Sequence, residues 1–209
     1  MFCYPTSSGP SINDLDSLCQ HYLTILYTNL NQHTPEIKSE HPVCETYGEI
    51  LYSSIDKLIA AVPLTEQDVF IDLGSGLGKV VLQFFLKSVI KSAFGIEILP
   101  HLHDQAVIAA QKLQQQLPEF YSGGRELNFI LGDALAIPIP TATVAFINCT
   151  CFPQLLLNQL GCLIDATPSI HTVFSLRPIS TLQRFKCIKS ISIECSWDSA
   201  LCYLYRACE

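Results

Sequence analysis

The chain has 209 residues, of which 49% are hydrophobic and only 15% are charged, with a mean hydropathy of +0.31. This composition excludes a disordered chain, because so much apolar surface must be buried in a core, and the length suits one domain better than two. The formal net charge of −7 disfavours nucleic acid as the main partner, because an acidic protein lacks the field that attracts phosphate backbones.

The acidic charge is concentrated in the first third of the chain. Residues 1–67 carry two basic and eight acidic side chains, whereas residues 134–209 carry five basic and four acidic ones. If the first third contacts a macromolecule, we therefore expect a basic protein segment rather than RNA or DNA. The sequence gives no indication of the oligomeric state.

Several features favour a soluble, cytoplasmic protein. The first Lys or Arg is Lys38, so the start resembles neither a signal peptide nor a transit peptide. The most apolar stretch, residues 80–90, contains Gln83 and Lys87 and is far shorter than the ~20 residues that a membrane span needs. The ten cysteines contain no Cys-x-x-Cys pair, which favours free thiols in a reducing compartment, and we expect no bound metal.

The pattern of the first 67 residues predicts two helices. An apolar stripe from Leu15 to Leu30 indicates the first helix. The second is expected from about Tyr47 to Ala61, where Thr46 and Glu49 have the spacing of a capping box. We therefore expect residues 1–45 to form an N-terminal helical extension or lid.

From residue 68 the pattern changes to alternating strands and helices. Short strands are expected around residues 69–71, 93–96, 127–131, 144–147 and 171–175, with helices at about 79–91, 100–117 and 153–163. Residues 186–195 and 200–206 then flank a Ser-Trp-Asp-Ser turn and predict an antiparallel hairpin. The fold class is therefore α/β: residues 46–209 should form a mostly parallel, Rossmann-like sheet with a C-terminal antiparallel hairpin.

Polar residues or glycines follow four strands of this predicted sheet. They are Asp72 to Gly78, Glu97, Asp133 and Asn148. In open α/β sheets, ligands bind beyond the carboxyl ends of the strands. A single polar strand end is more often a helix cap or a solvated residue, but four on successive strands predict a binding site.

The loop after the first of these strands indicates which ligand binds. Gly74, Gly76 and Gly78 are spaced G-x-G-x-G, and Lys79 stands where a dinucleotide-binding fingerprint has its third glycine. Glycines let the backbone turn sharply and approach a ligand closely. Asp72, just before the loop, would repel a pyrophosphate but favours a ligand with ammonium and sulfonium groups. S-adenosylmethionine carries both, and we expect it to be the cofactor.

Two further acids suit the remainder of that cofactor. Glu97, 19 residues past Gly78, lies where an acidic side chain accepts hydrogen bonds from both ribose hydroxyls. Asp133 can accept one from the adenine amino group. His101 and His103, which follow the ribose-binding turn, are interpreted as exposed residues at the start of a helix.

The sequence resembles the disruptor-of-telomeric-silencing histone lysine methyltransferases over about residues 41–178. The shared elements are Thr46-Tyr47-Gly48-Glu49, Val69 to Gln83, Phe94 to Glu97, Gly132-Asp133, and Phe146-Ile147-Asn148 with Phe152. The glycine loop is common to many class I methyltransferases, whereas Tyr-Gly-Glu upstream of it and Asn-x-x-x-Phe after the fourth strand are much more specific. The resemblance implies a class I methyltransferase fold and transfer of a methyl group from S-adenosylmethionine to a protein lysine.

The resemblance also implies roles for individual residues. Tyr47 and Glu49 would lie over the methionine end of the cofactor, Asn148 would orient the target amine, and Phe152 with Tyr47 would wall a narrow lysine channel. The cofactor-binding residues would be Tyr47, Glu49, Asp72, Gly74, Ser75, Gly76, Gly78, Glu97, Asp133 and Asn148. The catalytic residues would be Asn148, Phe152 and Tyr47.

The chain departs from the family pattern at two positions. Lys79 stands where the family has Gln, and Thr150 replaces one aromatic residue of the channel. Family members also carry a larger N-terminal helical region and basic segments that hold nucleosomal DNA. Three alternatives therefore stay open: a small-molecule methyltransferase, an RNA methyltransferase with Cys151 as the nucleophile, and a non-catalytic module that binds S-adenosylmethionine.

Overall fold

The computed structural model describes residues 12–31, 49–139 and 141–208, and the chain divides into two compact units, residues 1–36 and 37–209. The first unit contains the predicted first helix, α1 (Ile12–Asn31). Within it, the hydroxyls of Thr24 and Thr28 each donate a hydrogen bond of 2.8 Å to the carbonyl four residues earlier, which satisfies these side chains inside the helix.

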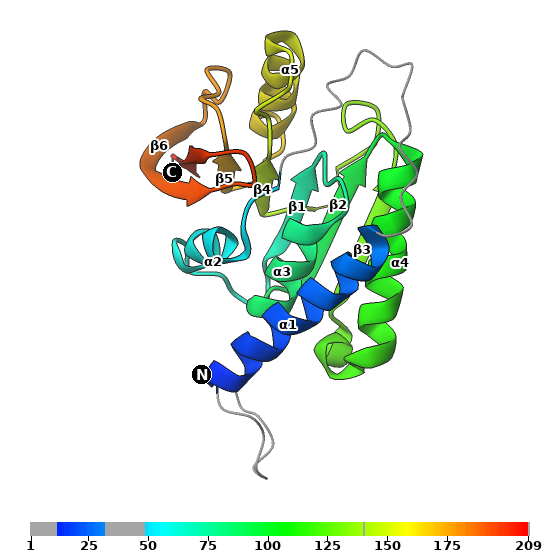
Figure 1. The fold of residues 1–209 in the computed structure, drawn as a ribbon. Coiled ribbons are helices and arrows are strands. Elements are labelled where there is room, and N and C mark those ends of the chain that lie inside the picture. Colours follow the sequence, from blue (N-terminus) through cyan, green and yellow to red (C-terminus); the bar gives the residue numbers. More distant parts are fainter. Residues whose placement is uncertain (1–11, 32–48, 140, 209) are drawn as a thin grey trace. The chain divides into compact units, whose positions relative to one another are not determined.

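The second unit is built on a seven-stranded sheet with the order β3-β2-β1-β4-β5-β7-β6 (Figure 1). The strands are β1 (Val69–Leu73), β2 (Ser92–Glu97), β3 (Glu126–Leu131), β4 (Val144–Ile147), β5 (Thr172–Ser175), β6 (Phe185–Glu194) and β7 (Ser199–Ala207). The first five run parallel, and β7 is antiparallel to both β5 and β6. The predicted mostly parallel sheet with a C-terminal antiparallel hairpin is thus confirmed.

Helices pack on the sheet because its strands bury side chains on both faces. The helices are α2 (Tyr52–Ala60), α3 (Lys79–Lys87), α4 (Pro100–Gln116) and α5 (Gln154–Asp165), with a 3-10 helix, η1, at Pro118–Gly124. Phe70 of β1 stacks on Phe84 of α3, with ring centroids 3.9 Å apart. The next residue, Ile71, belongs instead to the core cluster that contains Leu157 of α5. A strand buried on both sides has a continuous apolar run, as this one does.

Helix α2 begins later than the sequence predicts. It starts at Tyr52, and Leu51 before it has an extended backbone and makes no side-chain cap. Ile50 instead forms an antiparallel bridge with Cys195, at the end of the hairpin. Glu49 therefore lies outside the helix, and the predicted capping box is wrong, because pairing with the hairpin holds this segment extended.

Asp68 ties together the amino ends of three strands. This carboxyl is 6% exposed and accepts hydrogen bonds from the backbone and hydroxyl of Thr65 (2.7 and 2.9 Å) and from the hydroxyl of Thr143 (2.7 Å). Nε2 of His171 lies 3.2 Å away. Burial alone would raise the pKa of Asp68, but these hydrogen bonds and the charge of His171 outweigh it and lower the pKa.

Within the part of the chain that the structure describes, every helix is too short or too polar to cross a membrane.

Candidate functional site

A cavity of about 520 Å³ lies at the carboxyl ends of β1, β2 and β4, where the strand order reverses. Its size is within the range of small-molecule sites. Among the predicted site residues, those that line it are Glu49, Asp72, Gly74, Ser75, Gly76, Glu97, Asp133, Asn148 and Phe152. Gly78 is not among the lining residues, and Tyr47 lies outside the described residues.

The glycine loop leads from β1 into α3 with a left-handed backbone. The φ angles of Gly74 and Gly78 are 93° and 80°. A Cβ at Gly78 would lie 2.4 Å from the ring of Phe129, and one at Gly74 would lie 3.0 Å from the ring of Phe152. Gly78 therefore serves the packing of α3 against β3, whereas Gly74 lets the Phe152 ring lie directly against the loop at the cavity.

Glu97 holds the glycine loop in position. Its carboxylate is 7% exposed and accepts hydrogen bonds from the backbone amides of Gly76 (2.7 Å) and Leu99 (2.9 Å), one on each oxygen. Each carboxylate oxygen can accept a second hydrogen bond, so these contacts leave capacity for ribose hydroxyls. This structural role cannot be predicted from the sequence, because it depends on the pairing of β1 with β2.

Asp72 is a buried acid with an unsatisfied oxygen. The residue is 2% exposed, and its Oδ1 has no hydrogen-bond partner among the described residues. Burial, together with the charge of Glu97, raises the pKa of Asp72 well above its ordinary value. The hydroxyl of Ser75 is likewise buried and unsatisfied. Such atoms are rare in folded proteins, and both residues line the cavity, so a ligand with cationic and hydrogen-bonding groups fits here.

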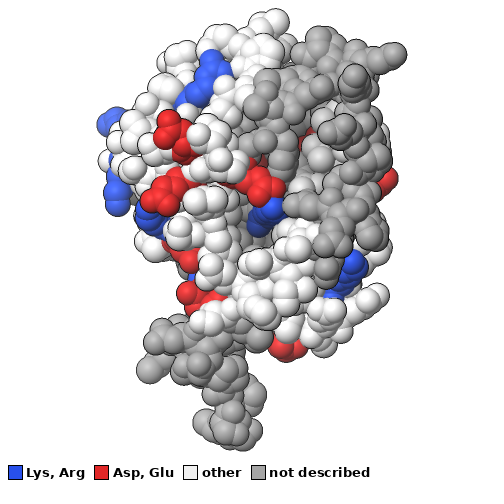
Figure 2. All heavy atoms as spheres, in the orientation of Figure 1, with Lys and Arg blue, Asp and Glu red and all other residues white. Residues whose placement is uncertain are grey.

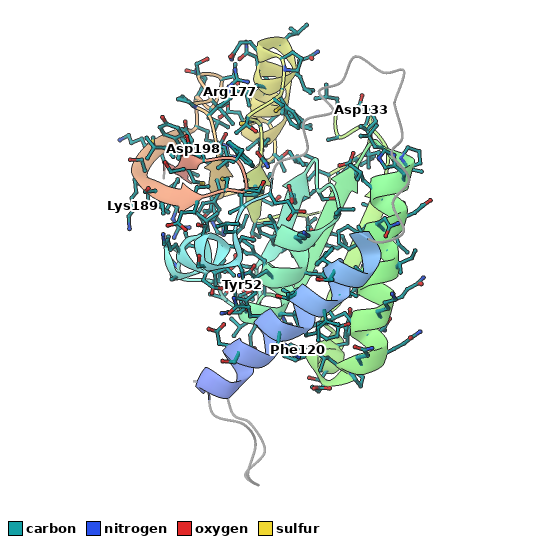
Figure 3. The ribbon with its side chains drawn as sticks, in the orientation of Figure 1. Tyr52, Phe120, Asp133, Arg177, Lys189 and Asp198 are labelled. Carbon is teal, nitrogen blue, oxygen red and sulfur yellow. The ribbon has the colours of Figure 1, made fainter. Side chains whose placement is uncertain are left out.

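Asp133 and Asn148 lie at the ends of β3 and β4. Asp133, labelled in Figure 3, is exposed, and its Oδ1 accepts a hydrogen bond of 2.9 Å from the amide of Leu135. This local cap uses one of its two carboxylate oxygens. The side-chain carbonyl of Asn148 accepts a hydrogen bond of 3.2 Å from the hydroxyl of Thr150, which replaces a family aromatic residue.

Arg177, just after β5, holds the loop between β4 and α5. One guanidinium nitrogen of this residue, labelled in Figure 3, donates to the carbonyls of Cys149 (3.2 Å) and Phe152 (2.5 Å). The other donates to the side chain of Gln154 (2.7 Å). Sequence reasoning missed this residue, since no local pattern marks it. Only the pairing of β4 with β5 brings it to the loop.

Lys79 is the only Lys or Arg among the described residues that line the cavity. It is the first residue of α3, and its Nζ lies 2.5 Å from Oε1 of Glu49. The backbone of Glu49 is in turn held by Ser196 of the hairpin turn, through hydrogen bonds of 3.1 and 2.7 Å. The departure from the family pattern at Lys79 therefore belongs to the site itself.

The two histidines at the start of α4 differ from their predicted exposure. His101 and His103 are both half-buried, and His101 lines the cavity, because the first turn of α4 packs beside the end of β2. In the described ranges, no group of three or more His, Cys, Asp or Glu side chains is placed to hold a metal ion.

Several solved structures with a similar fold are methyltransferases. An RNA methyltransferase from Salinibacter ruber in complex with S-adenosyl-L-homocysteine aligns with a TM-score of 0.52 and 20% identity, over 74% of this chain and 90% of that one. The B. subtilis M1A22 tRNA methyltransferase TrmK aligns with a TM-score of 0.56 and 16% identity, over 76% of this chain and 67% of that one. At these identities the likeness concerns the fold alone, which is that of the class I methyltransferases.

The family is more specific than the fold. The family model for the histone methylation protein DOT1 matches residues 33–196. The H3 lysine-79 specific histone-lysine N-methyltransferase of Drosophila melanogaster (the number is the histone's) is 30% identical over 149 residues, which are 69% of this chain and 8% of that protein. Its Caenorhabditis elegans counterpart is 31% identical over 138 residues, which are 64% of this chain and 14% of that protein. The chain belongs to the DOT1 family and spans a small part of the length of these relatives.

Proposed function

We propose that this protein transfers a methyl group from S-adenosylmethionine to the ε-amine of a protein lysine. The observation that carries the proposal is the buried oxygen of Asp72, which has no partner among the described residues and lies in a cavity at the switch point of a DOT1-family sheet. A buried carboxylate is stabilised when a cation lies beside it. The amino-acid end of the cofactor supplies cationic groups of this kind.

The cofactor would be held by groups from three strand ends. Asp72 would bind its cationic end, Glu97 its ribose hydroxyls and Asp133 its adenine, while Gly74 and Gly76 allow the backbone to approach it closely. The cofactor supplies a methyl group that its sulfonium has already activated. The protein's task is then to position the acceptor and to exclude water.

Asn148 and Phe152 would position the acceptor amine. Both line the cavity, and the Phe152 ring lies against the glycine loop while Arg177 holds the backbone of Phe152. A lysine has an ordinary pKa of about 10.4 and must lose its proton to attack, and an apolar wall favours the neutral amine. The Asn148 amide can orient that amine. Tyr47 is proposed as a further wall on the family resemblance alone.

A basic protein segment is the acceptor that the charge of this chain favours. The net charge is −7, and on the face shown in Figure 2 the described Lys and Arg side chains are scattered rather than gathered into one patch. An acidic surface attracts basic segments and repels phosphate backbones. A histone, the substrate in the names of the relatives, has this character and would place the protein in the nucleus rather than in the cytoplasm.

Transfer of a labelled methyl group tests the proposal. In three separate reactions, the protein is incubated with radiolabelled S-adenosylmethionine and one acceptor. The acceptors are core histones, cellular RNA and the small-molecule fraction of a lysate. We expect label in histone lysine after acid hydrolysis. Label that enters only RNA or small molecules would overturn the lysine assignment.

The variant Asn148→Ala distinguishes positioning of the acceptor amine from binding of the cofactor. We expect this variant to abolish transfer while its affinity for S-adenosylhomocysteine, measured by calorimetry, stays close to that of the unaltered protein. The reason is that the Asn148 amide mainly orients the acceptor, while Asp72, Glu97 and Asp133 hold the cofactor. An equal loss of transfer and affinity would assign Asn148 to the cofactor site instead.

A further inference from the structure

The cavity is acidic with one exception. Glu49, Asp72, Glu97 and Asp133 all line it, and Lys79 is the single Lys or Arg that does so among the described residues. Carboxylates suit the cationic groups, ribose hydroxyls and adenine amine of S-adenosylmethionine, but they repel its α-carboxylate. Lys79 is therefore the side chain whose charge matches this last group.

We propose that the Lys79–Glu49 ion pair is the element that recognises the zwitterionic amino-acid end of the cofactor. Lys79 binds the α-carboxylate, and Glu49, released from Lys79, joins Asp72 in binding the α-ammonium. The inference rests on the proposed use of S-adenosylmethionine. The pair carries one ammonium and one carboxylate, 2.5 Å apart, and an α-amino acid carries the same two charges, so the two can exchange partners without an uncompensated charge.

The position of Lys79 favours an anion for a second reason. It is the first residue of α3, and Gly78 at the N-cap has no side chain that could cap the helix. The positive end of the helix dipole at the N-terminus of α3 therefore also favours a negatively charged group near Lys79. In the same cavity, the buried Oδ1 of Asp72 and hydroxyl of Ser75, which have no hydrogen-bond partner in the described part of the chain, independently indicate a polar ligand.

The ion pair can open at little cost. The Lys79 and Glu49 side chains are 22% and 28% exposed, and partly exposed ion pairs contribute little to stability. The backbone of Glu49 is held by Ser196, and the neighbouring Ile50 pairs with Cys195. Glu49 therefore stays at the edge of the cavity when its side chain turns from Lys79 to a ligand.

Calorimetric titration with three ligands tests this inference. The ligands are S-adenosylhomocysteine, its α-carboxamide, which lacks the negative charge, and 5′-methylthioadenosine, which lacks the amino-acid end. We expect the unaltered protein to bind S-adenosylhomocysteine at least about tenfold more tightly than the carboxamide, the scale of one charged hydrogen bond. Lys79→Met should bring that ratio close to one, mainly by weakening the parent ligand, and should leave 5′-methylthioadenosine unaffected.

A matched control lies on the same helix. Lys87 of α3 forms an ion pair of 3.0 Å with Asp56 and does not line the cavity, so Lys87→Met should keep the ratio of the unaltered protein. Because a ratio of affinities does not depend on the folded fraction, a partly unfolded Lys79 variant remains informative, and Lys79→Gln provides a milder one.

The outcomes separate this inference from the proposed function. An unchanged ratio in Lys79→Met, in a protein that binds S-adenosylhomocysteine, would overturn the role of Lys79 and leave the cofactor assignment intact. If none of the three ligands binds the unaltered protein, the proposed function itself is wrong.

Discussion

Two buried aspartates at opposite ends of β1 have opposite properties. Asp68 precedes the strand, accepts hydrogen bonds from two threonines and has a lowered pKa. Asp72, four residues later, has an oxygen without a partner among the described residues and a raised pKa. The amino end of the sheet is thus satisfied internally, whereas the carboxyl end is left for a ligand to complete. Both residues are aspartates, so it is the incomplete hydrogen bonding of Asp72, and not its residue type, that indicates the functional end of the strand.

Removing the satisfied acid should have the largest effect on stability. Asp68→Ala leaves the hydroxyl of Thr143, the amide of Thr65 and the His171 imidazole without their acceptor, and we expect a loss of about 3 kcal/mol in the free energy of unfolding. Urea denaturation measures this loss. The affinity for S-adenosylhomocysteine, measured under native conditions, should stay unchanged, and a comparable loss of affinity would contradict the separation of the two ends.

Changing Asp72 should have the opposite effect: it should weaken ligand binding and should not reduce stability. Asp72→Asn removes the charge that the cofactor's cation would neutralise, so we expect the affinity for S-adenosylmethionine to fall by about 2 kcal/mol, the scale of a charged hydrogen bond. Without ligand, the variant should be more stable at neutral pH by about 1 kcal/mol, or about 2–4 °C in melting temperature, because residue 72 then no longer carries a carboxyl that is buried beside Glu97. A variant that binds normally, or that melts earlier, would show that Asp72 is satisfied in solution.

The stability contributions of Asp68 and Asp72 should change with pH in opposite directions. These changes should be smaller than the effects of the two substitutions above. The lowered pKa of Asp68 contributes stability above the unfolded-state pKa of about 3.9, which is lost as the pH falls through the folded-state pKa. The raised pKa of Asp72 contributes stability below about 3.9, which is lost as the pH rises through its folded-state pKa.

Unfolding curves at several pH values test this sign difference. The deficit of Asp68→Asn should shrink as the pH falls toward about 3, since the native carboxyl then becomes neutral as well. The gain of Asp72→Asn should grow as the pH rises from the same point. Parallel stability profiles for both variants and the unaltered protein would contradict the opposite pKa shifts.

The sequence by itself determined the architecture and most of the cavity. Apolar runs bounded by polar residues predicted the parallel strands, and the loop around Gly74 and Gly76, with Asp72, Glu97 and Asp133, predicted their carboxyl ends as the binding site. These signals are local, because side-chain periodicity and glycine spacing are properties of short segments. In a parallel sheet, such segments place their carboxyl ends together.

Tertiary structure alone decided which polar groups have partners. Glu49 is paired with Lys79 and held by Ser196, 147 residues later, while Asp68 meets His171 across 103 residues. The predicted capping box was wrong for this reason, because the hairpin draws the segment at Glu49 into an extended conformation. No spacing in the sequence carries such pairings, since they follow from strand order and from the chain segments that the folded core brings into contact.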